Sequence, residues 1–164
     1  MIKILLIGYG NIDRQDDGVA WHILRNIARK LKIEFPDMPY DFYSLESGDL
    51  TFMFDLQLIP ETAEIISNFD VVYFIDAHTG AIPEDISFTQ VDCCYQNSPL
   101  THHMTPSSCL EITYQVYNKL PKSYICSVRG FSFLFTNDLS EKTIELAESA
   151  SELLVQKILE ETRM

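Results

Sequence analysis

The sequence lacks paired cysteine motifs and a long apolar run, and it is poor in basic residues. Its four cysteines (Cys93, Cys94, Cys109 and Cys126) show no C-x-x-C spacing, which argues against a disulfide framework or a zinc knuckle and favours reduced thiols in the cytoplasm. Lys and Arg number 12 against 24 Asp and Glu, and the resulting charge of −12 argues against nucleic acid or an anionic membrane as a partner. No apolar run approaches the roughly 18 residues of a membrane helix.

The remaining composition is that of a globular protein. Of the 164 residues, 46% are hydrophobic and 22% are charged, which predicts one domain over residues 1–164 with its own core and, by default, a monomer. The opening run of residues 1–7 is apolar and leads into Gly8-Tyr9-Gly10 without a small-residue cleavage site. We interpret it as a first strand and not as a signal peptide.

Alternating strand and helix patterns follow along the chain. The predicted fold class is α/β: a three-layer, mostly parallel central sheet of about five strands with helices on both faces, whose ligands bind beyond the carboxyl ends of the strands. The run at 71–75 is apolar throughout, which predicts a central strand. Strands are predicted over 2–8, 40–45 (joined to the first by a parallel crossover), 71–75, 86–91 (an edge) and 124–128, and helices over 19–31, 61–68, 106–120 and from Ser140 to the end.

The loop after the first strand resembles a dinucleotide-binding turn, but its chemistry opposes that function. Gly8 and Gly10 are in place, whereas the third glycine is replaced by Asp13, and Asp16 and Asp17 add negative charge where a pyrophosphate would bind. A nucleotide-binding regulator is therefore disfavoured. One acid of the pair is expected to cap the following helix, which leaves the other free.

Acids and histidines are also expected at the same edge of the sheet. Asp76 ends the central apolar run, although alone it could equally serve a turn, and residues 101–106 supply His102 and His103 before a predicted helix. Two carboxylates and one imidazole form a three-ligand site that suits nickel, iron, manganese or zinc. From the residues alone, His78 and His103 stay open as alternatives to His102.

Other reactive residues have simpler explanations. His22 lies within the first helix and is read as a half-buried or surface histidine, and the Cys93-Cys94 pair, which has no basic neighbour, is read as a packed strand end. Ser107 and Ser108 lack the G-x-S-x-G nucleophile elbow, so a serine triad is discounted.

Three segments together resemble the [NiFe] hydrogenase maturation endopeptidases. The family's first strand, its G-x-G-N turn and its acidic pair are matched by residues 8–11 and 16–18, and its strand-end Asp-Ala by Asp76-Ala77 after the typical segment 56–61. Its Ser/Thr-His segment, with a proline four residues after the histidine, is matched by Thr101-His102 and Pro106. The ordered set spans nearly the whole chain.

The resemblance implies a function and a set of site residues. It places the metal ligands at Asp17, Asp76 and His102, with proline spacing selecting His102 over His103. It implies an endopeptidase that removes the C-terminal extension of the nickel-loaded large subunit precursor of a [NiFe] hydrogenase, with nickel supplied by the substrate and other divalent ions able to occupy the site. Asp17 and Asp76 are our candidates for catalysis, through a water activated by them or by the metal. The alternative is a noncatalytic metal-binding or metalloprotein-binding maturation factor of the same fold.

Two segments depart from the family pattern. Residues 45–49 lack the Gly-Gly-Thr run of relatives, and residues 130–133 replace a stretch that contains more proline. We expect both departures to affect the choice of substrate.

Overall fold

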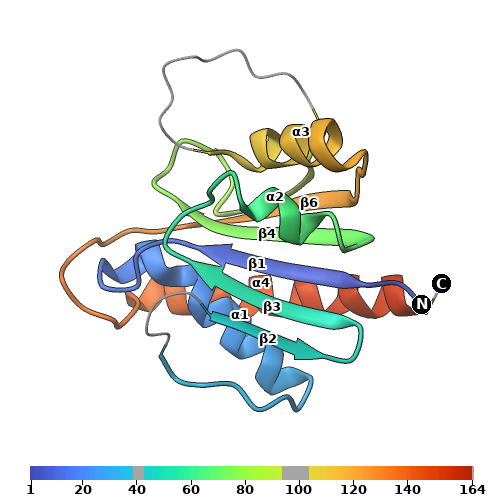
Figure 1. The fold of residues 1–164 in the computed structure, drawn as a ribbon. Coiled ribbons are helices and arrows are strands. Elements are labelled where there is room, and N and C mark those ends of the chain that lie inside the picture. The colour runs from blue at the N-terminus through green and yellow to red at the C-terminus, as the bar shows by residue number, and fades with distance from the viewer. Residues whose placement is uncertain (39–42, 94–103, 164) are drawn as a thin grey trace.

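The computed structural model describes residues 1–38, 43–93 and 104–163, which form a six-stranded sheet between two helical layers (Figure 1). The elements in chain order are β1 (Ile4–Tyr9), the 3-10 helix η1 (Gln15–Gly18), α1 (Val19–Lys30), β2 (Tyr43–Ser47), β3 (Leu50–Asp55), α2 (Thr62–Ile66), β4 (Val71–His78), β5 (Ile86–Gln90), α3 (Pro106–Tyr117), β6 (Lys122–Arg129) and α4 (Glu141–Thr162). The predicted α/β class is confirmed, with six strands where about five were expected.

The sheet is parallel at its centre and antiparallel at both edges. Its strand order is β2-β3-β1-β4-β6-β5; the pairs among β3, β1, β4 and β6 are parallel, and β2 and β5 pair antiparallel. The central place of β4 and the edge place of β5 are as predicted.

The prediction for the second strand was wrong in its connection. Residues 43–47 form an edge strand that pairs antiparallel with β3, so the two make a hairpin and not a parallel crossover. The turn between them contains Gly48, whose φ of 60° is a conformation that glycine adopts readily. The strand that pairs parallel with β1 on this side is therefore β3, for which no strand was predicted. The first part of the predicted strand, residues 40–42, lies outside the described residues.

Alternating side chains of the strands bury both faces of the sheet. Leu6 and Tyr73 belong to a core that includes residues of α1 and α4, among them Trp21. Leu5 and Phe74 belong to a second core with residues of α2 and α3. The three layers are as predicted. Among the described residues, no helix is long and apolar enough to cross a membrane.

The position of β1 defines where a ligand can bind. In the sheet, β1 lies between β3 and β4. The chain first continues from β1 to the β2–β3 side and later crosses to β4 on the other side, so the loops that leave the carboxyl ends of β1 and β4 diverge. Open α/β sheets bind ligands in the crevice at such a switch point. Asp17 lies in the segment that leaves β1, and Asp76 lies near the carboxyl end of β4.

Candidate functional site

Asp17 and Asp76 line one cavity of about 380 Å³ at the carboxyl ends of β1 and β4. The cavity wall therefore contains two carboxylates from different parts of the sequence. The other lining residues are Tyr9, Gly10, Asn11, Leu56, Gln57, Leu58, Ala77 and Met104.

The glycines of the first loop bring Asp17 back toward β1. Gly10 has a φ of 145°, and a Cβ atom there would lie 2.1 Å from the backbone oxygen of Asp17. The backbone N–H of Asn11 donates a hydrogen bond of 2.8 Å to Oδ2 of Asp17. Gly10 thus permits a close approach of two chain segments, a role that needs no bound phosphate.

Asp76 is held by two hydroxyl groups from the neighbouring strands. Tyr9 Oη donates to Oδ2 at 2.9 Å, and Ser127 Oγ donates to Oδ1 at 2.7 Å. β4 continues to His78, so the alternative of a turn at Asp76 is wrong. Neither Tyr9 nor Ser127 was predicted. The position of Tyr9 between the two glycines of the first loop was a possible signal. Ser127 offered none, because its pairing with Asp76 depends on the register of β4 and β6.

Burial makes the Asp76 carboxylate more basic. Burial raises its pKa above the ordinary value, the neighbouring Asp17 adds to the rise, and the hydrogen bonds from Ser127 and Tyr9 offset part of it. Burial also raises the pKa of Tyr9, as does the charge of Asp76, so the Tyr9 hydroxyl stays protonated and acts as the donor.

Asp16 has a different environment from its neighbour Asp17. The side chain of Asp16 is fully buried. The N-cap residue of α1 is Gly18, so the prediction that one of the two acids caps this helix was wrong. Asp16 accepts hydrogen bonds from Phe131 N, Ser132 N, Ser140 N, Ser140 Oγ and Thr143 Oγ1, at distances between 2.6 and 3.0 Å. Asp16 therefore links η1 by hydrogen bonds to the loop between β6 and α4 and to the first turn of α4.

These hydrogen bonds explain how a charged carboxylate is tolerated inside the protein. Burial by itself raises the pKa of Asp16, but the hydrogen bonds from Ser140, Phe131 and Ser132 outweigh it and hold the pKa below its ordinary value. Because its lone pairs are occupied by the protein, Asp16 is a structural acid, and Asp17 is the one that faces the cavity.

The histidines divide into two groups. His102 and His103 lie outside the described residues, and within the described ranges no three His, Cys, Asp or Glu side chains are grouped as a metal site. His78 is buried, its Nε2 hydrogen-bonds the Glu84 carbonyl at 3.0 Å, and its Nδ1 accepts from Gly80 N at 3.1 Å. With both ring nitrogens engaged, His78 is unsuited to replace His102 as a ligand.

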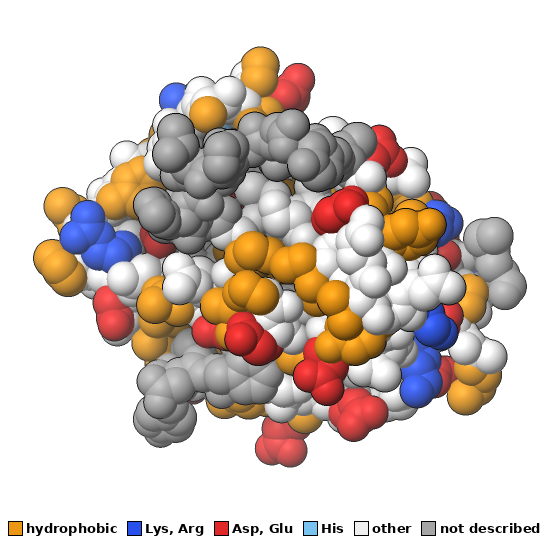
Figure 2. Space-filling model, turned by 45° about the horizontal axis from the view of Figure 1, so that its top comes forward, with side chains coloured by type: hydrophobic (Ala, Val, Ile, Leu, Met, Phe, Trp, Pro, Cys, Tyr) orange, Lys and Arg blue, Asp and Glu red, His pale blue; other side chains and the backbone are white. Residues whose placement is uncertain are grey.

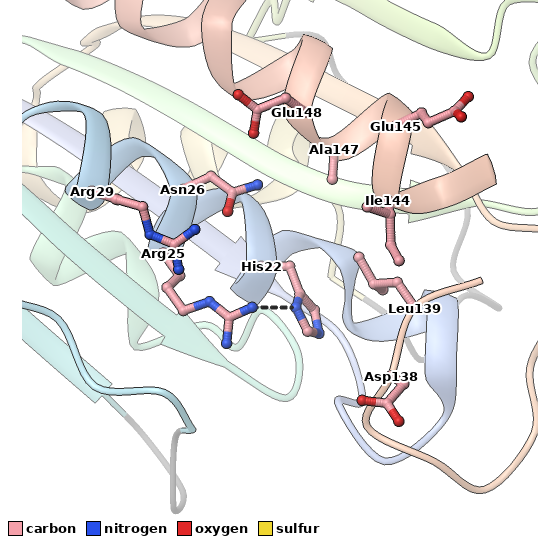
Figure 3. A pocket seen from close by; sticks show the side chains of 10 residues that line it. All are labelled: His22, Arg25, Asn26, Arg29, Asp138, Leu139, Ile144, Glu145, Ala147 and Glu148. Carbon is pink, nitrogen blue, oxygen red and sulfur yellow. Dashed lines mark hydrogen bonds between the residues drawn. The ribbon is translucent and has the colours of Figure 1, made fainter. Parts of the chain in front are cut away.

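His22 lies in a second, larger cavity of about 730 Å³, where side chains of α1 face those of α4 (Figure 3). Its Nδ1 accepts a hydrogen bond from Arg25, and its Nε2 lies 3.2 Å from the carbonyl oxygen of Asn137. Burial and the Arg25 charge lower its pKa to about 4. The prediction of a half-buried histidine is confirmed, and this cavity contains neither Asp17 nor Asp76.

The buried thiols of Cys109 and Cys126 give no support to cysteine chemistry. Burial raises the pKa of Cys109 and of Cys126 to about 12, which keeps both thiols protonated at neutral pH. Cys94 lies outside the described residues.

A scan of protein-family models and a search of curated proteins found no match. Solved structures do match. The hydrogenase maturating endopeptidase HybD from E. coli superposes with a TM-score of 0.72 at 15% identity, over 98% of this chain and 94% of its own. The [NiFe] hydrogenase maturation protease HycI from Thermococcus kodakarensis KOD1 gives 0.62 at 20% identity, over 94% and 91%. An endopeptidase from Escherichia coli gives 0.65 at 17% identity, over 93% and 90%. The chain has the fold of the [NiFe] hydrogenase maturation proteases.

Proposed function

We propose that this protein is a hydrogenase maturation endopeptidase that removes the C-terminal extension from the nickel-loaded large subunit precursor of a [NiFe] hydrogenase. The observation that carries the proposal is the convergence of Asp17 and Asp76 in one cavity at the switch point of the sheet. The same two acids stand at the positions where the sequence motifs resemble that family.

The donor set suits a divalent ion carried by the substrate. Each carboxylate oxygen of Asp76 accepts one hydrogen bond and keeps a further lone pair, and the Asn11 N–H bond occupies only Oδ2 of Asp17. His102 is proposed as the third ligand; it precedes Met104, which lines the cavity, by two residues in the sequence. Two carboxylates and one imidazole would leave positions for ligands of the substrate.

The proposed preference for nickel-loaded precursor follows from a metal site to which the protein contributes only three ligands. Three ligands add to the ligands that an inserted nickel ion already has, so a precursor that contains nickel binds more tightly than an empty one. The enzyme would then cut only a precursor that has received its metal.

The proposed reaction is hydrolysis of one peptide bond. A water molecule gives a proton to Asp17 or Asp76, its oxygen bonds to the carbonyl carbon, and the C–N bond breaks as the leaving amine takes up a proton. The cavity of about 380 Å³ is large enough for a short stretch of extended peptide at the carboxylates.

Cleavage of a purified precursor tests the proposal. Nickel-loaded precursor is incubated with the wild-type protein or with Asp76→Asn, and the large subunit is weighed by intact mass spectrometry. We expect a shortened subunit with the wild type and none with the variant. Unimpaired cleavage by Asp76→Asn contradicts the proposed site, whereas binding of the precursor without cleavage by the wild type identifies a noncatalytic maturation factor.

A further inference from the structure

Asn11 lines the candidate cavity and has no role in the proposed reaction as described so far. It follows Gly10 in the first loop and is half-buried. Its backbone N–H donates to Oδ2 of Asp17 at 2.8 Å, so the two residues are in direct contact. Both line the cavity of about 380 Å³ that also contains Asp76. Asn11 therefore lies beside the carboxylates at which the peptide would be cut.

A hydrogen bond within the loop fixes the orientation of the Asn11 side-chain amide. Its Oδ1 accepts from the backbone N–H of Asp13 at 3.0 Å, in the kind of turn that asparagine side chains commonly form. Because a backbone N–H can only donate, the amide atom that faces it must be the oxygen. The Nδ2 group therefore lies on the other side of the planar amide. The Asn11 carbonyl accepts from Arg14 N at 3.1 Å, so the backbone is held as well.

The Nδ2 group of Asn11 keeps both of its N–H donors available. It has no hydrogen-bond partner among the described residues, whereas the backbone N–H, the carbonyl and Oδ1 of Asn11 are all engaged. It is also accessible, since the buried side-chain atoms without a partner in the described ranges are Nε of Arg25 and Nε of Arg129. An amide that is held by its oxygen and keeps its donors is preorganised to bind an acceptor atom.

Among the described residues of the cavity wall, Asn11 has the only side-chain donor that is both fixed and free. The described lining residues include no Lys, Arg or His, so the side-chain donors are those of Tyr9, Asn11 and Gln57. The Tyr9 hydroxyl donates to Asp76, and Gln57 is exposed without a hydrogen bond to hold it. On the side of α2 and α3, the described Lys and Arg side chains lie toward the margins of the surface, and hydrophobic and acidic ones lie nearer its middle (Figure 2).

We propose that the Nδ2 group of Asn11 donates a hydrogen bond to the carbonyl oxygen of the peptide bond that is cut. This role rests on the proposed function and adds to it a residue that contacts the reacting atoms. As the water oxygen bonds to the carbonyl carbon, a water proton passes to Asp17 or Asp76 and the C=O electron pair moves onto the carbonyl oxygen. The neutral amide stabilises the negative charge of that oxygen, beside a wall that already contains two carboxylates. The charge is lost when the C=O bond forms again, the C–N bond breaks and the leaving amine takes up the proton.

Two substitutions at Asn11 separate the N–H donors from the turn. Asn11→Asp keeps an acceptor for the Asp13 N–H and loses the donors, whereas Asn11→Ala loses both and adds no charge. Both variants keep the backbone N–H that holds Asp17. Single-turnover cleavage of nickel-loaded precursor is followed by intact mass spectrometry at increasing concentrations of enzyme. We expect the maximal rate to fall by about 100-fold to 1,000-fold in both variants, the range for one lost oxyanion donor, with the half-saturating concentration of Asn11→Ala within threefold of the wild type.

Asn26→Asp is the matched control. Asn26 is a half-buried asparagine of α1 that lines the other cavity, so the same chemical change there should leave the rate and the half-saturating concentration within twofold. A normal maximal rate in either Asn11 variant overturns the proposed role while the proposed function stands. Loss only in Asn11→Asp would be an effect of the added charge, and loss only in Asn11→Ala an effect of the turn. A wild-type protein that cuts no precursor refutes the proposed function and the role of Asn11 with it.

Discussion

The hydroxyl of Tyr9 on β1 donates a hydrogen bond of 2.9 Å to Oδ2 of Asp76 on the adjacent strand β4. Ser127 on the opposite neighbour, β6, holds the other oxygen at 2.7 Å. The carboxylate is therefore fixed from both sides, which is how proteins commonly orient a metal-binding or catalytic side chain.

Removing the Tyr9 hydroxyl should weaken the site without unfolding the protein. We expect Tyr9→Phe to lower kcat/KM for nickel-loaded precursor by about 10-fold to 100-fold, the range found when a partner of a metal ligand is lost. Tyr73→Phe is the control, because Tyr73 is a buried tyrosine of β4 that belongs to the core on the α1 and α4 side. Equal activity of the two variants would show that the Tyr9 bond has no functional role.

The neighbours Asp16 and Asp17 should respond oppositely to substitution. Asp16→Ala leaves the partly buried N–H groups of Phe131 and Ser140 without their acceptor. It should lower the free energy of unfolding by about 3 kcal/mol or more, since each hydrogen bond to a charged group contributes roughly 1.5–3 kcal/mol. Asp17→Asn should change that free energy by about 1 kcal/mol or less and abolish cleavage. Urea unfolding measures the first effect and precursor cleavage the second. A stable Asp16→Ala protein, or an active Asp17→Asn protein, would reverse the roles assigned here.

The Gly10 backbone should tolerate no side chain. In Gly10→Ala the new Cβ would meet the backbone oxygen of Asp17, so we expect displacement of the Asp17 loop and loss of cleavage of at least 100-fold. Gly48→Ala is matched in having positive φ, but open space surrounds it, so it should cost only about 1 kcal/mol of stability and leave cleavage intact. Similar kinetics for both variants would argue against this tight packing.

Acid should destabilise the protein partly through His22. Burial holds the folded-state pKa of His22 at about 4, below its ordinary 6.5, so between these values the unfolded chain binds the proton that the folded protein excludes. Stability from this group is complete above pH 6.5 and is lost as the pH falls to 4, by up to about 3 kcal/mol. The free energy of unfolding in urea is compared for the wild type and His22→Gln. As the pH falls from 6.5 to 4, the wild-type value should decrease by that amount relative to the value of the variant. A constant difference would contradict a depressed pKa.

Some of the structure could be predicted because local patterns determine it. Uninterrupted apolar runs identified β1 and β4, and Pro106 marked the start of α3, where Thr105 Oγ1 accepts from Ser108 N at 3.1 Å. The β2–β3 hairpin was missed because the prediction ended at residue 45 and assigned no strand to the apolar residues that follow the Gly48 turn. A strand pattern shows that a segment is extended, but it does not identify its partner.

The candidate site was predictable in its acids but not in their surroundings. The ends of parallel strands meet at one edge, so Asp17 and Asp76 could be expected there from their positions in the sequence. The roles of Asp16, Tyr9 and Ser127 depend on contacts between residues 51 to 127 positions apart, which no local pattern contains. His102 remains a prediction.

The proposed endopeptidase should cleave its precursor only when nickel is present. The same precursor is prepared with and without nickel, each form is incubated with the wild-type protein and with Asp76→Asn, and the products are weighed by intact mass spectrometry. We expect loss of the C-terminal extension only from nickel-loaded precursor and only with the wild type. Equal cleavage of both precursor forms, or cleavage by Asp76→Asn, would contradict it.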